Sequence, residues 1–429
     1  MVDQELLARL NAPETEERLF ELKRLHEREL RGEIPRPATT RDTNNHIHTI
    51  YSFSPYSPAA AVWFAYQSGL CTAGIIDHDA IAGAREFIEA GKIVGIATTI
   101  GCEVRVSFTG TPLEGKRLNN PDEVNSAYIA LHGVPYNRID ELDSVLCGIR
   151  KKRNARNVRQ IKRLNALLPE EMHLDFERDV AGLSMYTQGG SVTERHILSA
   201  LANRLISVYG KGARIADFLE NRLNIPLTGH TADILRDAGR PAYAYDVLNV
   251  LKSGLVPRFF ISGGEDSLPV ADMVEVAKRI GAIPTYCYLG DVGDSPTGDK
   301  KAQKFEDDIL DEVFDVIEQI GFEAIAYMPS RNTPQQLERV MQKAEQKGLM
   351  QISGEDINQP SQSFVCEKLR EARFAHLAEN TWALVGHELA ATQDAKEIIY
   401  GANAKAAYPD LHERLRAYAQ KGRALSEMR

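Results

Sequence analysis

The chain lacks long apolar stretches and has few cysteines, and both absences narrow its class. No segment of its 429 residues approaches the roughly 20 apolar residues that a membrane-spanning helix needs. Its first residues are acidic, unlike a basic and apolar export signal. The five cysteines are scattered and form no Cys-x-x-Cys pair, which favours reduced thiols over a disulfide framework. We therefore expect a cytoplasmic protein without a membrane segment.

Excess positive charge is also lacking, because the formal net charge is -9. Proteins that bind nucleic acids in general need basic surface for phosphate contacts, so a nucleic-acid partner is unlikely from the overall charge. We find no internal repeat and no low-complexity tract. The length and the 43% hydrophobic composition fit one large globular enzyme domain with added segments.

The most informative feature that is present is a pair of histidines, His46 and His48. In an extended strand, residues two apart share a face, so a His-x-His sequence aims both imidazoles at one point. Imidazole is a common metal ligand, and two converging rings indicate a metal site.

Similar polar groups follow other short apolar runs. The run 73–76 ends in Asp77, His78 and Asp79, the β-rich segment 96–106 carries Glu103, and the run 128–131 ends in His132. In β/α barrels the chemistry gathers at the carboxyl ends of the strands. Four such runs with metal-capable groups are therefore typical of a barrel enzyme.

This series of His-x-His, Asp-His-Asp, Gly-x-Glu and a strand-terminal His resembles the PHP superfamily, named for polymerase and histidinol phosphatase. Its members are mostly metal-dependent phosphoesterases. The resemblance runs from about residue 42 to about residue 360 and implies an α/β fold with a distorted (β/α)7 barrel. The family's barrel binds up to three metal ions, usually zinc, manganese or iron.

The resemblance also implies roles for individual residues. A first ion would be held by His46, His48, Glu103 and the late acid Asp356. Glu103 would bridge to a second ion that His132 also binds. Asp77 and His78 match the family's Asp-His pair, in which the histidine serves a third ion or the substrate phosphate.

Three departures from the family pattern limit the number of ions. Phe53 stands where many members have a third-metal acid, and Asn358 replaces the histidine of the late Gly-Ser-Asp-x-His motif. Tyr288 lies where a late Ala-His-Pro histidine is usual, so the missing ligand would be a water or His196. We therefore expect one to two divalent ions per chain.

His196 follows Arg195 in a sequence that resembles an Arg-x-His helix start of some phosphatase members. Ser191 and Glu194 have the spacing of a capping box, which predicts that His196 lies in the first turns of a helix. The positive end of that helix would also suit phosphate.

Ordinary structural roles stay open for these residues. His46 and His48 would then be plain strand histidines, and Glu103 would form a buried salt bridge to a base such as Arg105. His132 would be a core histidine and Asp356 a turn acid. His196 could equally lie on a helix surface.

Three segments are predicted to surround the barrel, which is expected over 41–360. Residues 1–40 form a helical extension, packed on the barrel or at a contact of a homo-oligomer. A helical insertion at about 141–188 carries a basic run from Arg150 to Arg163, either a solvated helix face or a cap that attracts phosphate-bearing substrates. Residues 361–429 form a helical segment, with helices at 367–380, 381–391 and 409–425, in which His387 has a packing or surface role. Later strands are expected at 258–261, 283–288, 324–328 and 350–353, and helices at 270–280 and 304–320.

The expected function is hydrolysis of a small phosphorylated metabolite or nucleotide by a metal-activated water. His78, oriented by Asp77 or Asp79, would bind the phosphate or protonate the leaving oxygen. The candidates for the non-bridging phosphate oxygens are Arg195, Arg331, Lys300 and Lys301. Two alternatives remain: a barrel that has lost ligands and serves as a structural or interaction module, and a metal-dependent nuclease.

Overall fold

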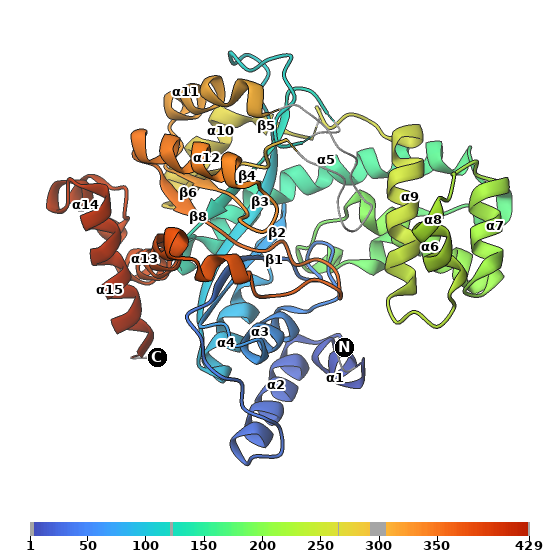
Figure 1. Cartoon of the computed structure of the whole chain (residues 1–429), viewed down its shortest axis with the longest axis horizontal. Coiled ribbons are helices and arrows are strands. Elements are labelled where there is room, and N and C mark those ends of the chain that lie inside the picture. Colours follow the sequence, from blue (N-terminus) through green and yellow to red (C-terminus); the bar gives the residue numbers. More distant parts are fainter. Residues whose placement is uncertain (1–3, 121–122, 265, 292–305, 428–429) are drawn as a thin grey trace.

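The computed structural model describes residues 4–120, 123–264, 266–291 and 306–427, and its centre is one mixed β-sheet (Figure 1). The strands run in the spatial order β1-β2-β3-β4-β6-β7-β8, and β5 pairs with β3. Their bounds are β1 (Thr43–Ile47), β2 (Thr72–His78), β3 (Ala97–Ser107), β4 (Ser126–His132), β5 (Leu268–Pro269), β6 (Ile283–Cys287), β7 (Ala324–Ala326) and β8 (Met350–Ile352).

The sheet curls so that the segment after β8 returns to β1. Ile357 forms a parallel bridge with Ile47, and backbone hydrogen bonds join it to His46 and His48 at 3.1 and 3.0 Å. The fold is therefore the expected distorted α/β barrel. One strand departs from the parallel pattern, because β4 pairs antiparallel with both β3 and β6. As expected, His132 is the last residue of its strand, β4.

Helices cover the outside of the barrel between the parallel strands. They are α3 (Pro58–Gln67), α4 (Ala84–Val94), α10 (Val270–Ile280), α11 (Leu310–Ile320) and α12 (Pro334–Gln346). Their ends follow local chemistry: Ser57 caps α3 by accepting a hydrogen bond from the Ala60 N–H, and Gly281 ends α10 in a left-handed conformation. The predicted helix at 270–280 and the three last strands are confirmed to within two residues.

The N-terminal extension consists of α1 (Gln4–Leu10) and α2 (Thr15–Leu30), which pack on α3 and α4. Arg18 of α2 and Glu86 of α4 form an ion pair at 2.5 Å, and both side chains are almost fully buried. A buried charge needs such a partner, so this pair fixes the extension to the barrel.

The helical insertion is longer than predicted. It begins with α5 (Ile139–Asn165) and continues through α6 (Glu194–Tyr209), α7 (Ala213–Asn221), α8 (Gly229–Arg236) and α9 (Tyr243–Phe259). Helices α6 to α9 lie in the lobe on the right of Figure 1 and, with the end of α5, build their own hydrophobic core. The predicted strand at 258–261 is wrong, because α9 continues through Pro257 to Phe259.

The C-terminal segment contains α13 (Ala375–Gln393), α14 (Ala402–Ala407) and α15 (Leu411–Glu427). Helix α13 replaces the two helices expected at 367–380 and 381–391. It crosses the base of the barrel, the end at which the parallel strands begin. There Glu388 accepts a hydrogen bond from the Ile100 N–H at 2.8 Å, and His387 bonds to the Gly281 carbonyl oxygen at 2.9 Å, so the packing role of His387 is confirmed.

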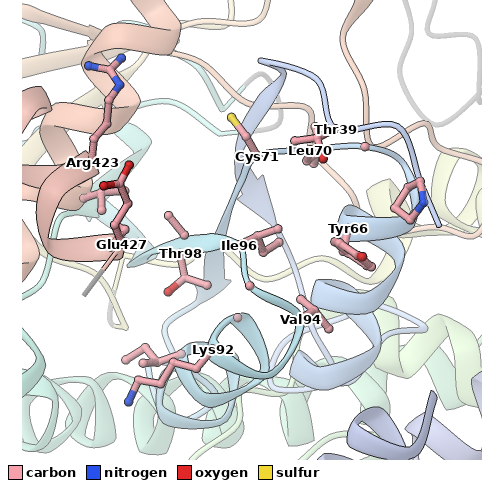
Figure 2. A pocket seen from close by; sticks show the side chains of 18 of the residues that line it. Thr39, Tyr66, Leu70, Cys71, Lys92, Val94, Ile96, Thr98, Arg423 and Glu427 are labelled. Atoms are coloured by element: carbon pink, nitrogen blue, oxygen red, sulfur yellow. The ribbon is translucent and has the colours of Figure 1, made fainter. Parts of the chain in front are cut away.

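A cavity of about 600 Å³ also lies near this base, between the N-terminal and C-terminal helices (Figure 2). Tyr66, Cys71, Thr98 and Arg423 are among its lining residues. The predicted site residues are absent from that lining, so this cavity is separate from the candidate site. Among the helices of the described residues, none combines the length and the hydropathy needed to cross a membrane.

Candidate metal centre

His46 and His48 come together where β1 ends. The pairing of β1 with β2 is irregular between Asn44 and Ile47, so the strand is not ideal there. The two rings nevertheless lie together, with centroids 5.1 Å apart. The convergence predicted from the His-x-His sequence is present in the structure.

Acids and a further histidine from other strands complete two potential ligand groups. One group is His46, His48 and Asp356, and the other is His48, His78 and Glu103; within each, the ligand atoms lie within 4.8 Å of one another. His48 belongs to both groups. These five residues come from four chain segments, so the barrel brings together residues that are more than 300 positions apart.

The closest contacts in the cluster are between imidazoles and carboxylates. His48 Nε2 lies 3.4 Å from Asp356 Oδ1, and His78 Nδ1 lies 2.9 Å from Glu103 Oε2. Burial acts to raise the pKa of Glu103, but the neighbouring His78 and His46 outweigh it and lower that pKa to about 2. The pKa of Asp356 is likewise held well below its usual range by His48, against the effect of burial. Both acids are therefore carboxylates at neutral pH.

His132 approaches the same cluster from the antiparallel strand β4. It pairs with Gly101, and since Glu103 shares the face of Gly101, His132 and Glu103 point to the same side of the sheet. Burial and the nearby His46 lower the pKa of His132 to about 3. The ring is thus neutral at physiological pH, as a metal ligand must be, although it lies outside the two groups above.

Gly101 makes this approach of β3 and β4 possible. A Cβ atom at this position would lie 2.4 Å from the Leu131 carbonyl oxygen. No side chain fits into that space, so glycine is required where the strand carrying His132 pairs with the strand carrying Glu103.

Asp77 does not orient His78, contrary to the expectation. Its carboxylate accepts hydrogen bonds from the Thr49 N–H at 2.7 Å, the Thr49 hydroxyl at 2.6 Å and the Ser52 hydroxyl at 2.6 Å. Asp79 does not face His78 either and pairs with an arginine of α5. Glu103 is the acid that contacts His78.

Ser52 is a residue that the motif comparison missed. Its hydroxyl gives its one proton to Asp77, so it accepts a hydrogen bond from His48 Nδ1, 3.3 Å away. This leaves His48 Nε2 as the ligand atom, which is the side that faces Asp356. Such outer partners fix the orientation of metal-bound histidines in many proteins.

The donor set of imidazoles and carboxylates fits a divalent transition metal such as zinc, manganese or iron. Of the two carboxylates, Glu103 is buried and Asp356 is partly buried.

No protein-family model matches the chain, and no curated protein matches it. Among solved structures, a protein from Bifidobacterium adolescentis described as a putative metal-dependent phosphoesterase aligns with a TM-score of 0.50 and 19% identity, over 76% of this chain and 93% of that one. The two proteins share a fold. An amidohydrolase from Chromobacterium violaceum aligns with a TM-score of 0.49 and 16% identity, over 76% of this chain and 90% of that one. At the level of the fold, the first likeness confirms the resemblance expected from the histidine and acid motifs.

Phe53, which stands where the resemblance implies a third-metal acid, packs against two residues of α6. Phe53 packs edge-on against His196, with centroids 5.1 Å apart, and the Arg195 guanidinium lies over the Phe53 ring at 5.8 Å. His196 Nδ1 accepts a hydrogen bond from the Thr193 N–H at 3.0 Å. The capping box of α6 is therefore formed by Thr193 and His196, and the predicted one of Ser191 and Glu194 is wrong.

The other two departures lie in separate places. Asn358 donates a hydrogen bond to Asp356 at 2.6 Å, so the residue that replaces the family's histidine supports the first ligand group. The Tyr288 hydroxyl donates a hydrogen bond to Asp307, and the residue is 1% exposed. Tyr288 therefore makes a contact outside the two ligand groups.

Arg331 lies close enough to lower the pKa of Asp356. Lys300 and Lys301 lie outside the described residues.

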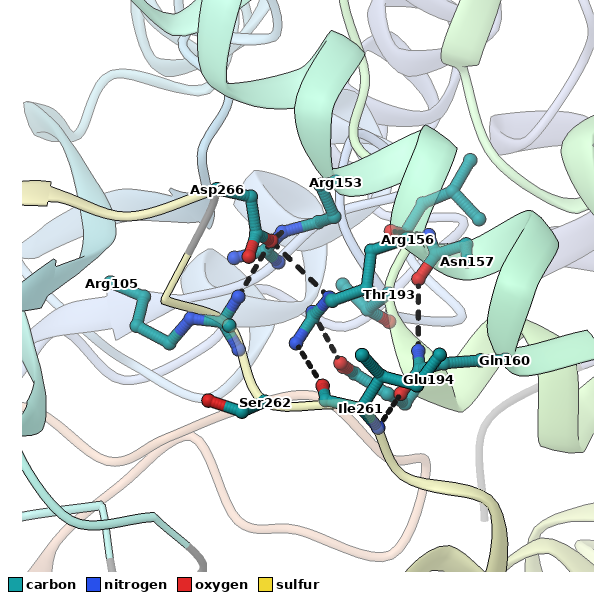
Figure 3. A network of polar contacts seen from close by, with 12 residues as sticks. Arg105, Arg153, Arg156, Asn157, Gln160, Thr193, Glu194, Ile261, Ser262 and Asp266 are labelled. Atoms are coloured by element: carbon teal, nitrogen blue, oxygen red, sulfur yellow. Dashed lines mark hydrogen bonds and ion pairs between the residues drawn. The ribbon is translucent and has the colours of Figure 1, made fainter. Parts of the chain in front are cut away.

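The basic run of the insertion has two faces, because Lys151, Lys152, Arg159, Lys162 and Arg163 are exposed while three arginines are not. Arg150, Arg153 and Arg156 of α5 are all at least 90% buried and face the barrel. Figure 3 shows Arg153 and Arg156 around Asp266, together with Arg105 of β3. Arg156 also pairs with Glu194 at 2.6 Å. This buried network of cations and acids joins the insertion to the barrel.

Proposed function

We propose that this protein is a metal-dependent phosphoesterase that hydrolyses a small phosphorylated metabolite or nucleotide. The observation that carries the proposal is the convergence of His46, His48, His78, Glu103 and Asp356 in two ligand groups that share His48. The buried Glu103 and the partly buried Asp356 bring negative charge together with imidazole nitrogens, and a bound cation would neutralise that charge. The fold, shared with a described phosphoesterase, supports the same class of reaction.

In this proposal His46, His48 and Asp356 hold the first ion, and His78, Glu103 and His132 are available for a second. A bound divalent ion would polarise a phosphate oxygen and lower the pKa of a bound water toward neutrality. Asp356 and Glu103 supply the negative charge that retains the ion, since both are ionised at neutral pH.

Side chains around the cluster would handle the rest of the phosphate. His78 has 27% of its side chain exposed and turns one nitrogen to Glu103, so its other nitrogen is available to bind the phosphate or protonate the leaving alkoxide. Arg331 places positive charge near Asp356, and Arg195 lies beside Phe53. A guanidinium can bind two phosphate oxygens at once, which makes these two residues the candidates for the non-bridging oxygens.

The nuclease alternative loses part of its support. It depended on the basic insertion, in which Arg150, Arg153 and Arg156 are buried and engaged with acids and backbone of the barrel and of α6. These three arginines are not available to follow a nucleic-acid backbone, whereas the other basic residues of the run are exposed: Lys151, Lys152, Arg159, Lys162 and Arg163.

Elemental analysis of protein purified without added metal, followed by a screen of phosphate mono- and diesters, tests the proposal. We expect one to two ions per chain. His48→Ala removes the residue shared by both groups, so it should lower metal content and reduce phosphatase activity at least a hundredfold, more than loss of an outer-shell partner costs. His412→Ala, at an exposed histidine of α15, is the matched control and should leave both unchanged. A stable wild-type chain without metal would support a structural module instead.

A further inference from the structure

Asp79 has an unusual backbone conformation directly beside the metal cluster. Its φ is +46°, and among the described residues only Asn125 and Asn224 are other non-glycine residues with positive φ. This left-handed region is unfavourable for L-residues, although aspartate and asparagine tolerate it better than most. Asp79 is the next residue after His78, so its conformation sets the direction in which the chain leaves the cluster.

Three contacts hold Asp79 in this conformation. Its N–H donates to the Glu103 carbonyl oxygen at 2.9 Å. Its carbonyl oxygen accepts from the Arg150 guanidinium at 3.0 Å, and its carboxylate pairs with Arg153 at 2.5 Å. Glu103 belongs to β3, whereas both arginines belong to α5 of the helical insertion.

The three residues that make the side-chain contacts are buried, so each charged group relies on the others and not on water for its partners. Asp79 is fully buried, and Arg153 and Arg150 are 2% and 7% exposed. A carboxylate without water needs a cation, and Arg153 is the nearest one. Strained residues of this kind persist only where the surroundings determine their conformation, and they often mark functional sites.

We propose that Arg150 and Arg153 are positioning residues of the metal centre: from α5 they hold the turn at Asp79 and so keep His78 beside Glu103. Neither arginine touches the ligand atoms, and both act through Asp79. The affinity of the site that contains His78 and Glu103 for its ion therefore depends on where α5 lies against the barrel. This inference rests on the proposed metal-dependent function, because it requires that the cluster binds an ion.

The consequence is a physical link between the insertion and the metal centre. Helix α5 also reaches the rest of the insertion, since Asn157 donates to the Val192 carbonyl oxygen at 2.8 Å, just before α6. A molecule that displaces the insertion would thus change the setting of His78.

The test compares two buried arginines by titration with cobalt ions, whose visible absorption reports the ligand geometry. Arg153→Met should weaken cobalt binding ten- to a hundredfold, the range found for outer-shell partners, and alter the absorption spectrum. Arg18→Met breaks an equally buried ion pair in the N-terminal extension and should change neither. Equal cobalt affinity and an equal spectrum in both variants would overturn the inference.

A double variant keeps the test valid if Arg153→Met folds poorly. Glycine adopts the left-handed conformation without strain and leaves no buried carboxylate. Asp79→Gly combined with Arg153→Met should therefore restore cobalt affinity to within a few-fold of wild type, and failure to restore it in a folded double variant would refute the positioning role. A wild-type chain that binds neither cobalt nor zinc would instead refute the proposed function itself.

Discussion

Replacing Ser52 by alanine is the most direct test of how the His48 ligand is oriented. Ser52 is fully buried, and its hydroxyl stands between Asp77, at 2.6 Å, and His48 Nδ1, at 3.3 Å. The change removes a single oxygen atom and leaves the backbone turn intact. The variant therefore keeps His48 as a ligand and removes only the hydrogen bond that orients its ring.

The size of the effect follows from the two hydrogen bonds. A hydrogen bond to a charged group contributes about 1.5–3 kcal/mol, and a buried donor left without an acceptor costs about 1–3 kcal/mol. Asp77 keeps its two bonds from Thr49, so part of the loss is absorbed. We expect Ser52→Ala to lower the free energy of unfolding of the metal-free protein by about 2–4 kcal/mol.

The metal affinity should fall as well, because His48 Nδ1 loses the acceptor that fixes its tautomer. Outer-shell changes of this kind typically cost 10–100-fold in affinity, which is about 1.4–2.8 kcal/mol. Competition with a chromophoric chelator measures the affinity, and urea unfolding monitored by circular dichroism measures the stability.

Ser57→Ala provides the matched control. Ser57 is also fully buried, but its hydroxyl caps α3 and bonds to the Leu10 carbonyl oxygen at 2.6 Å. Loss of this cap should cost about 1–2 kcal/mol of stability and no metal affinity. If Ser52→Ala retains the wild-type affinity while losing stability like the control, Ser52 does not orient His48 and our reasoning is wrong.

Two further predictions concern pH and packing. Burial lowers the pKa of His132 to about 3 and that of His387 to about 4. Histidines of the unfolded chain take up protons near pH 6.5, whereas these two buried histidines do not. The free energy of unfolding of the metal-free protein should therefore fall as the pH is lowered from about 6.5 to about 4. Each histidine contributes up to about 1.4 kcal/mol per pH unit, and urea midpoints at several pH values measure the decline; constant stability over this range would contradict it. Gly101→Ala places a Cβ against the Leu131 carbonyl oxygen, so it should lower the free energy of unfolding by about 1–3 kcal/mol or more and weaken metal binding through His132. Gly110 has open space around a Cβ but a positive φ, so Gly110→Ala should lower stability without changing metal binding.

The sequence was sufficient to bring His46 and His48 together because strand geometry is local, whereas Asp356 and Glu103 were expected only from the family resemblance. Residues that are two positions apart in a strand lie on the same face, so His46 and His48 converge wherever the strand lies in the fold. The three last strands and α10 were also predictable, and Gly281 ends that helix in the position expected of a C-cap.

The remaining features depend on contacts between distant segments. Arg150 and Arg153 have the spacing of an exposed basic face, and their partners Asp79 and Asp266 lie about 70 to 110 positions away in the sequence. The direction of β4 is likewise set by pairing with β3 and β6, which no local pattern reveals. At 258–261 the apolar residues after Pro257 suggested a strand, but packing in the core of the insertion keeps Phe259 helical.

The helix across the base of the barrel affects how the protein can be divided. Besides Glu388, helix α13 supplies Thr381, which accepts a hydrogen bond from Asn45 at 2.8 Å, next to His46. A fragment ending near residue 360 would contain every candidate ligand and still expose the start of β1 and β3 to water. The smallest chain able to form the metal centre therefore extends at least to Gln393, and a truncation series should show metal binding disappearing when α13 is removed.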